Sequence, residues 1–361
     1  VTEGKETTCL HEILEIFKQF YVQKYTKEVK YDNESIETFL KSVHVNTLSR
    51  QEALLCEGKI TQEEVHISLM AMKNNKTPGN DGITKELYLC LFEEIGELLT
   101  SSLNASFDQG SFTPSQRQAI IKLIQKPGKD NRMVNAWRPI SLLNVDIKIL
   151  SKILVRRILP LMPKIISEDQ YAYVKDRYIG EPVRLIWDVL HHLKENNQEG
   201  ILIAADLEAA FDPVDHDFMF AVLKRFGFLD TFIRWVYLLH FNIQSTVVNN
   251  GFSTGYFTLN RGTRQGDPLA AYLFIIIVIE ILASLFKQND AIKFLKIKDI
   301  PIKLCMFADD TTIFVQDKQS LCNVLSTFET FRKYSSLRLN LSKSEAACIG
   351  RTREEVPNFL V

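Results

Sequence analysis

The segment from Ile302 to Val315 restricts the fold of this chain more than any other. Its two halves, 302–306 and 311–315, are rich in apolar, aromatic and β-branched residues, and the tetrapeptide FADD at 307–310 separates them. This pattern predicts a β-hairpin with a pair of carboxylates at its tip. An isolated pair of aspartates is most often only a turn, because Asp is a favoured turn residue.

A third acid, Asp206, ends the apolar run GILIAAD that begins at Gly200. A continuous apolar run of this length predicts a buried strand that carries the carboxylate at its C-terminal end. If this strand lies beside the hairpin, Asp206, Asp309 and Asp310 converge. Carboxylates placed so close disfavour one another's ionisation, so we expect bound cations. Hard oxygen ligands suit two Mg²⁺ ions, with Mn²⁺ as an alternative, and such ions serve phosphoryl or nucleotidyl transfer.

Composition narrows the setting of this chemistry. The chain has 361 residues, which is typical of about two or three structural units. Its 43 Lys and Arg against 44 Asp and Glu give a net charge of −1, so any nucleic-acid contact must use a local basic patch. The six cysteines are scattered without a C-x-x-C pair, which argues against a zinc ribbon or a disulfide framework and favours an intracellular compartment.

The most apolar stretch runs from Pro268 to Phe286 and is nearly long enough to span a membrane. Glu280 lies inside it, and an acid at membrane depth is costly. We therefore predict a helix that is buried on most faces inside the protein, and no membrane partner.

The first part of the chain reads as helical. Apolar residues at helical spacing predict an amphipathic helix within 8–45, followed by a polar linker at 32–35. Thr61 and Glu64 form a capping-box pattern that predicts a helix over 61–76. Turn residues fill 77–82, and 83–108 returns to helix.

Basic residues gather in two later segments. The segments 119–129 and 135–142 predict two short strands around a basic turn, and 144–163 predicts a helix. The hairpin carries Lys122, Lys126, Lys129, Arg132 and Arg138, and the helix carries Lys148, Lys152, Arg156 and Arg157. Such runs are most often solvated faces, and contact with phosphates is the alternative.

Six sequence strings, in order, resemble a known family. DLEAAFD (206–212), RGTRQGDPL (261–269), FADD (307–310) and LNLSKSE (339–345) are similar to motifs A, B, C and D of reverse transcriptases, of the LINE type in non-LTR retrotransposons. TPGNDGITKELY (77–88) and WRPISLLN (137–144) resemble finger motifs of that family. The resemblance covers roughly residues 10–350.

The resemblance implies an α+β fold: the fingers and palm of a right-hand polymerase, with a ferredoxin-like antiparallel palm sheet and no thumb. Residues 1–76 would form an N-terminal helical extension and 77–361 the reverse transcriptase itself. Within the second part the motifs would fall at about 201–213 for A, 261–287 for B, 302–315 for C and 336–346 for D.

The implied activity is RNA-directed DNA synthesis, in which a dNTP is joined to the 3′-hydroxyl of a DNA or RNA primer on an RNA template. We expect the thumb and an endonuclease elsewhere in a longer polyprotein, and a nuclear or cytoplasmic ribonucleoprotein location. A catalytically decayed, nucleic-acid-binding remnant and a group II intron maturase are the alternatives. The intact set of three aspartates favours catalysis, and FADD with the N-terminal extension favours the LINE type.

The resemblance also implies roles for residues around the aspartates. Asp206, Asp309 and Asp310 would be catalytic metal ligands, with the main-chain carbonyl of Leu207 as a further one. Ala210 and Phe211 would contact the nucleotide. Phe211 matches the steric gate that excludes a 2′-hydroxyl, although an ordinary core aromatic is the alternative.

Other roles fall on the basic segments and on motif B. Arg138 would hold the triphosphate with Lys126, for which Lys122 and Lys129 are alternatives, and Lys343 would neutralise the leaving pyrophosphate. Gln265 would contact the nucleotide or template base, unless this segment is only a turn capped by Asp267. Residues expected to bind nucleic acid are Lys122, Lys129, Lys152, Arg156 and Arg264. Asp212 and Pro213 predict a helix start, and Asp176 stands where the family usually has glycine.

Overall fold

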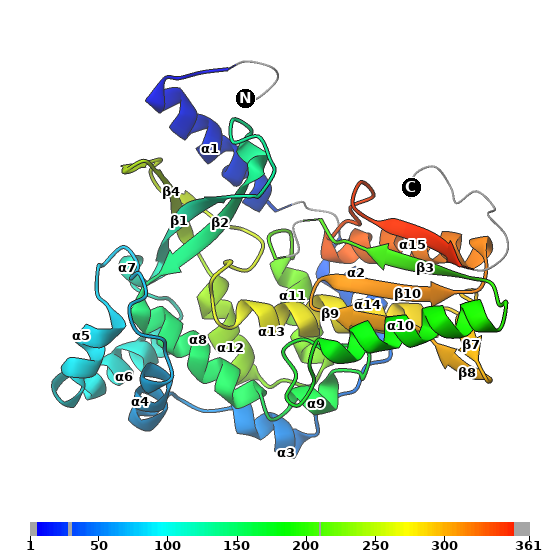
Figure 1. Cartoon of the computed structure of the whole chain (residues 1–361). Helices are drawn as coiled ribbons and strands as arrows, with labels where there is room; N and C mark the ends of the chain where they lie inside the picture. Colours follow the sequence, from blue (N-terminus) through cyan, green and yellow to red (C-terminus); the bar gives the residue numbers. More distant parts are fainter. Residues whose placement is uncertain (1–5, 28–30, 209–210, 350–361) are drawn as a thin grey trace.

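The computed structural model describes residues 6–27, 31–208 and 211–349. It is an α+β structure in which two larger sheets and one two-stranded sheet lie among helices (Figure 1). The predicted fold class is confirmed at this level, because most strand pairs are antiparallel and the helices are not regularly alternated with strands.

One sheet, which we call the acidic sheet because Asp206, Asp309 and Asp310 lie at its edge, has four strands in the order β11-β3-β10-β9. Every neighbouring pair of these strands is antiparallel. Their bounds are β3 Gly200–Ala205, β9 Leu304–Phe307, β10 Asp310–Val315 and β11 Glu345–Ile349. The predicted strand before Asp206 and the predicted hairpin around FADD are therefore confirmed, and β3 and β10 are direct neighbours.

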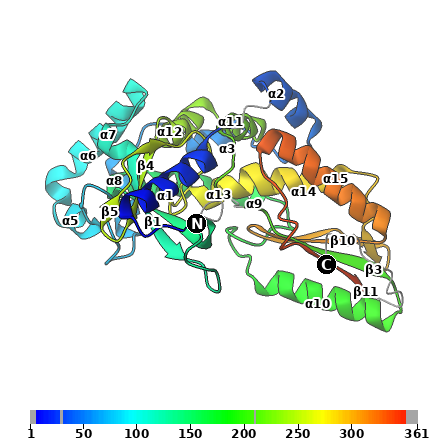
Figure 2. The same cartoon turned by 90° about the horizontal axis from the view of Figure 1, so that it is seen from above.

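Helices cover both faces of this sheet, as Figure 2 shows from above. On one side lies α10 (Gly180–Glu195), whose Val189 and Leu193 pack with Phe314. On the other side lie α14 (Glu280–Gln288) and α15 (Lys318–Ser335), on the same side as the buried side chains of Ile203 and Ile313. Helices on both faces account for the apolar residues of β3, although Ala204 near its end is exposed.

The second sheet carries the basic hairpin. Its strands are β1 Gln118–Gln125, β2 Trp137–Leu143, β4 Gln244–Asn249 and the short β5 Phe252–Ser253 and β6 Phe257–Thr258. β1 and β2 form the predicted antiparallel hairpin, and β4 joins β1 in parallel. Helix α1 (Leu10–Tyr25) packs on this sheet through Tyr21 and Tyr25, against Val247 and Phe257.

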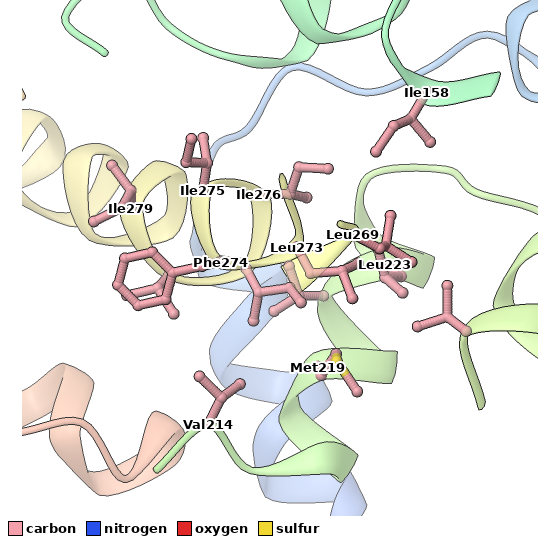
Figure 3. Packing of buried hydrophobic residues seen from close by; sticks show 14 of the residues in the cluster. Ile158, Val214, Met219, Leu223, Leu269, Leu273, Phe274, Ile275, Ile276 and Ile279 are labelled. Carbon is pink, nitrogen blue, oxygen red and sulfur yellow. The ribbon is translucent and has the colours of Figure 1, made fainter. Parts of the chain in front are cut away.

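The apolar stretch is a buried central helix, as predicted. It comprises α13 (Ala270–Phe274), a π-helical turn (Ile275–Ile279) and α14. By length and composition Ala270–Gln288 could cross a membrane, yet 78% of that apolar window is buried in the protein. Figure 3 shows its residues Leu273 and Phe274 in one cluster with Met219 and Leu223 of α11 (His216–Arg225).

The N-terminal helices differ in detail from the predictions. Residues 32–35 are not a linker but the start of α2, because the Asp32 side chain caps it by accepting a bond from the Ser35 N–H at 2.8 Å. The capping box of Thr61 and Glu64 is confirmed, although its helix ends at Met70. The bounds are α2 Asn33–Ser42, α3 Arg50–Ala53, α4 Gln62–Met70, α5 Lys85–Cys90, α6 Phe92–Gln109 and α7 Pro114–Arg117.

The remaining elements lie outside the two larger sheets, and β7 and β8 pair with each other in a two-stranded sheet. They are α8 Val145–Ile158, α9 Met162–Ile165, α12 Asp230–His240, β7 Leu295–Ile297 and β8 Ile300–Ile302, with short 3₁₀ turns at Leu54–Cys56 and Val134–Ala136.

The predicted helix start at Asp212 is wrong. Asp215 is the N-cap of α11, accepting from the N–H groups of Asp217 and Phe218, because Asp212 has other partners in α1.

Candidate active site

The acidic corner is the edge of the four-stranded sheet where Asp206, Asp309 and Asp310 lie. Thr311 pairs with Ala205, so the next position on each strand brings Asp310 beside Asp206 at the end of the ladder. Asp309 lies in the tight turn between β9 and β10. Burial, and then the charges of Asp309 and Asp206, raise the pKa of Asp310. The structure therefore brings all three carboxylates within electrostatic reach.

Asp206 is held by the segment 339–345. Its carbonyl accepts from the Asn340 N–H at 2.8 Å, and its Oδ2 accepts from Asn340 Nδ2 at 3.0 Å. The Asp206 N–H donates to Ser344 Oγ at 3.1 Å, and Lys343 Nζ lies 3.3 Å from Oδ2. Within this segment, the resemblance implied a role for Lys343 alone. Apart from their place in the string LNLSKSE, nothing in the sequence indicated that Asn340 and Ser344 would bind Asp206.

The corner offers the donors that a hard cation needs. The donor atoms at the corner are carboxylate oxygens, which hard cations prefer. The positively charged Lys343 ammonium lies beside one of these carboxylates, that of Asp206. Within the ranges 6–27, 31–208 and 211–349, no three acidic, histidine or cysteine side chains form a compact ligand set. The chemistry of the donors therefore fits Mg²⁺ or Mn²⁺, while the ligand set predicted from sequence is not fully assembled in this structure.

The basic hairpin of β1 and β2 lies near this corner. Lys126 Nζ donates to the Asn135 carbonyl at 2.8 Å. Burial lowers the pKa of Lys126, and the neighbouring charges of Lys24, Lys343 and Arg138 lower it further. Lys24 of α1, Arg138 of the same hairpin and Lys343 thus lie within electrostatic reach of Lys126. Lys343 also contacts the acidic corner, whereas Lys24 is paired with Asp212 at 2.6 Å. Such a gathering of like charges suits a polyanionic ligand.

The exposed face of the hairpin is also basic. Arg138 lies opposite Ile124 in the ladder, so Arg138 and Lys122 project to the same side of the hairpin, and both are exposed. Lys129 is exposed in the turn. These side chains are accessible to a ligand, whereas Lys126 is partly tied to its own hairpin.

Comparison with known proteins decides the family. The sequence model described as "Reverse transcriptase (RNA-dependent DNA polymerase)" matches residues 124–360. The chain belongs to the reverse transcriptase family. The match contains both the basic hairpin from Ile124 onward and the acidic corner, so the two features described above lie inside one family domain.

Its relatives are proteins of retrotransposons. The chain is 32% identical to the Transposon TX1 uncharacterized 149 kDa protein of Xenopus laevis, over 83% of this chain and 23% of that protein. It is 24% identical to the type-1 retrotransposable element R2 polyprotein of Popillia japonica, over 81% and 41%. It is also 24% identical to the RNA-directed DNA polymerase from mobile element jockey of Drosophila melanogaster, over 91% and 36%. The chain thus spans less than half the length of each of these relatives.

The residues expected at the nucleotide have mixed surroundings. The Phe211 ring is half-buried and packs at a tilt on Phe274, with 4.9 Å between ring centroids. Its carbonyl accepts from the Thr263 N–H at 2.9 Å, which joins motif A to motif B. Ala210 lies outside the described residues. A half-exposed ring is compatible both with a sugar contact and with partial packing.

Motif B is tied to the strand β2. The Gln265 carbonyl accepts from the Ser141 N–H at 2.7 Å. Gly266 has φ +115°, and a Cβ there would lie 2.7 Å from the Ser141 carbonyl oxygen. Glycine is therefore required at 266 for close approach to another strand, not only to a ligand. The Gln265 side chain is half-buried, and Asp267 Oδ1 accepts from the Leu269 N–H at 2.9 Å.

Two residues expected to bind nucleic acid have protein partners in this structure. Arg264 is 3% exposed, donates to the Leu239 carbonyl at 3.4 Å, and has its pKa lowered by burial. The nucleic-acid contact predicted for Arg264 therefore stays a prediction, and in this structure its guanidinium lies inside the protein. Lys152 is half-buried and donates to the Ala71 carbonyl at 3.3 Å, whereas Arg156 is exposed.

Asp176 adopts a left-handed backbone with φ 65°, which explains why glycine suits this position. Aspartate tolerates that conformation better than most residues. Its neighbour Arg177 donates to the main-chain carbonyls of Ser167 and Gln170 at 2.6 and 2.5 Å. The hydrogen bonds of Arg177 therefore stabilise the main chain of this turn.

Proposed function

We propose that this chain is the polymerase core of a non-LTR retrotransposon protein and catalyses RNA-directed DNA synthesis. The observation that carries the proposal is the acidic corner beside the gathered cations Lys126, Arg138 and Lys343, in a chain of the reverse transcriptase family. The four-stranded sheet then serves as the palm and the β1–β2 hairpin as part of the fingers. Residues 1–76 form the N-terminal extension in this division of the chain.

The cations are assigned to the phosphates. Arg138, an exposed guanidinium, binds the triphosphate of the incoming dNTP through charge-assisted hydrogen bonds, and Lys126 adds positive charge beside it. Lys343 is 62% exposed and lies at Asp206, so it can neutralise or protonate the departing pyrophosphate. Positioning and charge neutralisation of this kind account for most catalysis in phosphoryl transfer.

The acids are assigned to the metal. Asp206, Asp309 and Asp310, with the carbonyl of Leu207, are the residues that would hold Mg²⁺ or Mn²⁺. When bound, divalent cations lower the pKa of an attacking hydroxyl and stabilise charge on the leaving group. The bonds from Asn340 to Asp206 hold this carboxylate toward the corner.

The nucleic-acid partners are an RNA template and a DNA or RNA primer. Exposed Lys122, Lys129 and Arg156 are the candidates for phosphate contacts. Phe211 is proposed as the gate against a 2′-hydroxyl. We also propose that the chain acts as part of a longer polyprotein with a thumb and an endonuclease, in a nuclear or cytoplasmic ribonucleoprotein.

Primer extension tests the activity. An oligo(dT) primer on poly(rA), with dTTP and Mg²⁺, should yield extended DNA, and chelation of the metal should abolish the product. Primer–template binding, measured in parallel by fluorescence anisotropy, separates the outcomes. A folded protein that binds the primer–template without extending it, in Mg²⁺ and in Mn²⁺, would overturn the proposed catalysis in favour of a binding remnant.

A further inference from the structure

Gln170 reaches the acidic corner from outside the four family motifs. Its side chain is fully buried, at 0% exposure. Its Oε1 accepts from the Ala308 N–H at 3.1 Å and from the Ala172 N–H at 2.8 Å, and its Nε2 donates to the Ala308 carbonyl at 3.5 Å. Both ends of the amide therefore contact the residue that immediately precedes Asp309.

Ala308 needs this support. Its φ is 56°, in the left-handed region that a residue with a Cβ adopts at an energetic cost. A conformation of this kind persists only when its surroundings hold it in place. The turn connects β9 to β10, so the direction in which the Asp309 carboxylate leaves the sheet depends on the backbone at Ala308.

The contacts of the Gln170 side chain are separate from those that dock its segment. The main chain of this segment already bridges to β9, because the Tyr171 N–H donates to the Met306 carbonyl at 2.9 Å and the Met306 N–H donates to the Asp169 carbonyl at 2.8 Å. Arg177 in turn holds the Gln170 carbonyl at 2.5 Å. These bonds fix the segment without the Gln170 side chain. The amide of Gln170 can therefore hydrogen-bond to the turn between β9 and β10.

We propose that Gln170 is a positioning residue of the active site: by clamping Ala308 it fixes where the Asp309 carboxylate lies and so sets the affinity of the corner for divalent metal. Outer partners that orient a metal ligand typically contribute about 10-fold to 100-fold in metal affinity. The inference rests on the proposed function for its catalytic meaning, but the clamp itself can be measured without catalysis.

The test compares Gln170→Met with Gln316→Met. Gln316 is the control for the loss of a bond from a glutamine side chain to the main chain: its Nε2 donates to the Phe294 carbonyl at 2.9 Å just beyond the other end of β10, away from the acids, although Gln316 is exposed where Gln170 is buried. Both variants keep a similar side-chain volume and lose bonds between a side chain and the main chain. Each is first shown by thermal melting to unfold cooperatively.

Two readouts then separate positioning from general stability. Amide hydrogen exchange in a peptide covering 306–312 should speed up in Gln170→Met and stay as in wild type at Gln316→Met. Mn²⁺ binding to the protein–primer–template complex, followed by electron paramagnetic resonance, should weaken about 10-fold or more only in Gln170→Met. Unchanged exchange, or unchanged Mn²⁺ affinity in a variant with faster exchange, overturns the inference.

The same experiment distinguishes this inference from the proposed function. If wild type binds Mn²⁺ at the corner and Gln170→Met weakens that binding, the positioning role stands even when wild type extends no primer. If wild type extends primers and Gln170→Met needs no more Mg²⁺ for half-maximal extension than Gln316→Met does, the positioning role fails while the polymerase assignment stands.

Discussion

The acidic corner and the basic hairpin are built in opposite ways. Asp206 is fixed by Asn340 and Ser344 through main-chain and side-chain hydrogen bonds, whereas Arg138 projects from the hairpin as an exposed side chain. Long basic side chains lose much conformational freedom when ordered, so they are ordered best by the ligand itself. Short carboxylates attached to a sheet are preorganised before any ligand arrives. We infer that the corner provides position and the hairpin provides adaptable charge.

The largest expected effect comes from the preorganised side. Asp206→Asn or Asp309→Asn removes a charge while keeping the shape, so primer extension should fall by roughly a thousandfold or more. Binding of primer–template should be nearly unchanged. The control is Asp299→Asn, an exposed acid in the β7–β8 turn, whose left-handed φ of 66° asparagine accepts. Near wild-type extension by either corner variant would refute the assignment of these acids to the metal.

A smaller effect is expected on the adaptable side. Arg138→Ala should raise the apparent KM for dNTP by roughly 10-fold to 150-fold, since hydrogen bonds to charged groups contribute about 1.5–3 kcal/mol. Primer–template affinity should change much less. Lys296→Ala, which removes an exposed cation on β7, serves as the control in steady-state kinetics. An unchanged dependence on dNTP concentration would remove Arg138 from the triphosphate site.

Phe211 belongs to neither region, because its ring packs on Phe274 and its carbonyl accepts from the Thr263 N–H. Phe211→Ala should lower the preference for dTTP over UTP by about tenfold, on the scale of 1–3 kcal/mol that pocket shape supplies. Its stability should fall by less than the roughly 3–5 kcal/mol of a fully buried ring, because the ring is half-buried. Single-nucleotide insertion measures the preference. If the use of both nucleotides falls in parallel, Phe211 only packs against Phe274.

The smallest effect concerns an acid outside the corner. Burial raises the pKa of Glu280, whose carboxylate accepts from the Ser167 N–H at 2.9 Å. Its contribution to stability is therefore full below the ordinary value of 4.5 and is lost as the pH rises through the raised folded pKa. Glu280→Gln should gain in melting temperature relative to wild type at pH 8 compared with pH 5. An equal difference at both pH values would contradict the raised pKa.

Local patterns predicted much of this molecule. The strand before Asp206, the FADD hairpin and the capping box of Thr61 were correct because each depends on neighbours in the sequence. The helix start predicted at Asp212 failed for the opposite reason. Asp212 accepts from the Tyr25 hydroxyl at 2.8 Å and pairs with Lys24 at 2.6 Å, and Tyr25 lies 187 positions away in the chain.

Arg264 shows the same limit in the candidate site. Its sequence context is a polar turn, which favours exposure, yet tertiary packing buries its guanidinium against the Leu239 carbonyl. Lys152 is likewise drawn to Ala71 by the packing of α4 on α8. A basic residue's own neighbours in sequence do not specify which helix will cover it.

From the sequence alone one could read which acids end which strands, where basic residues gather, and the order of motifs that is typical of the reverse transcriptase family. How the acids are held follows from contacts between segments that are far apart in the chain. Asn340 binds Asp206 across 134 positions, and Gln170 binds Ala308 across 138. Hydrogen bonds of this kind depend on distance in space and not on separation along the chain. Periodicity fixes the face on which a side chain lies, while its partner is fixed only when the sheets and helices pack.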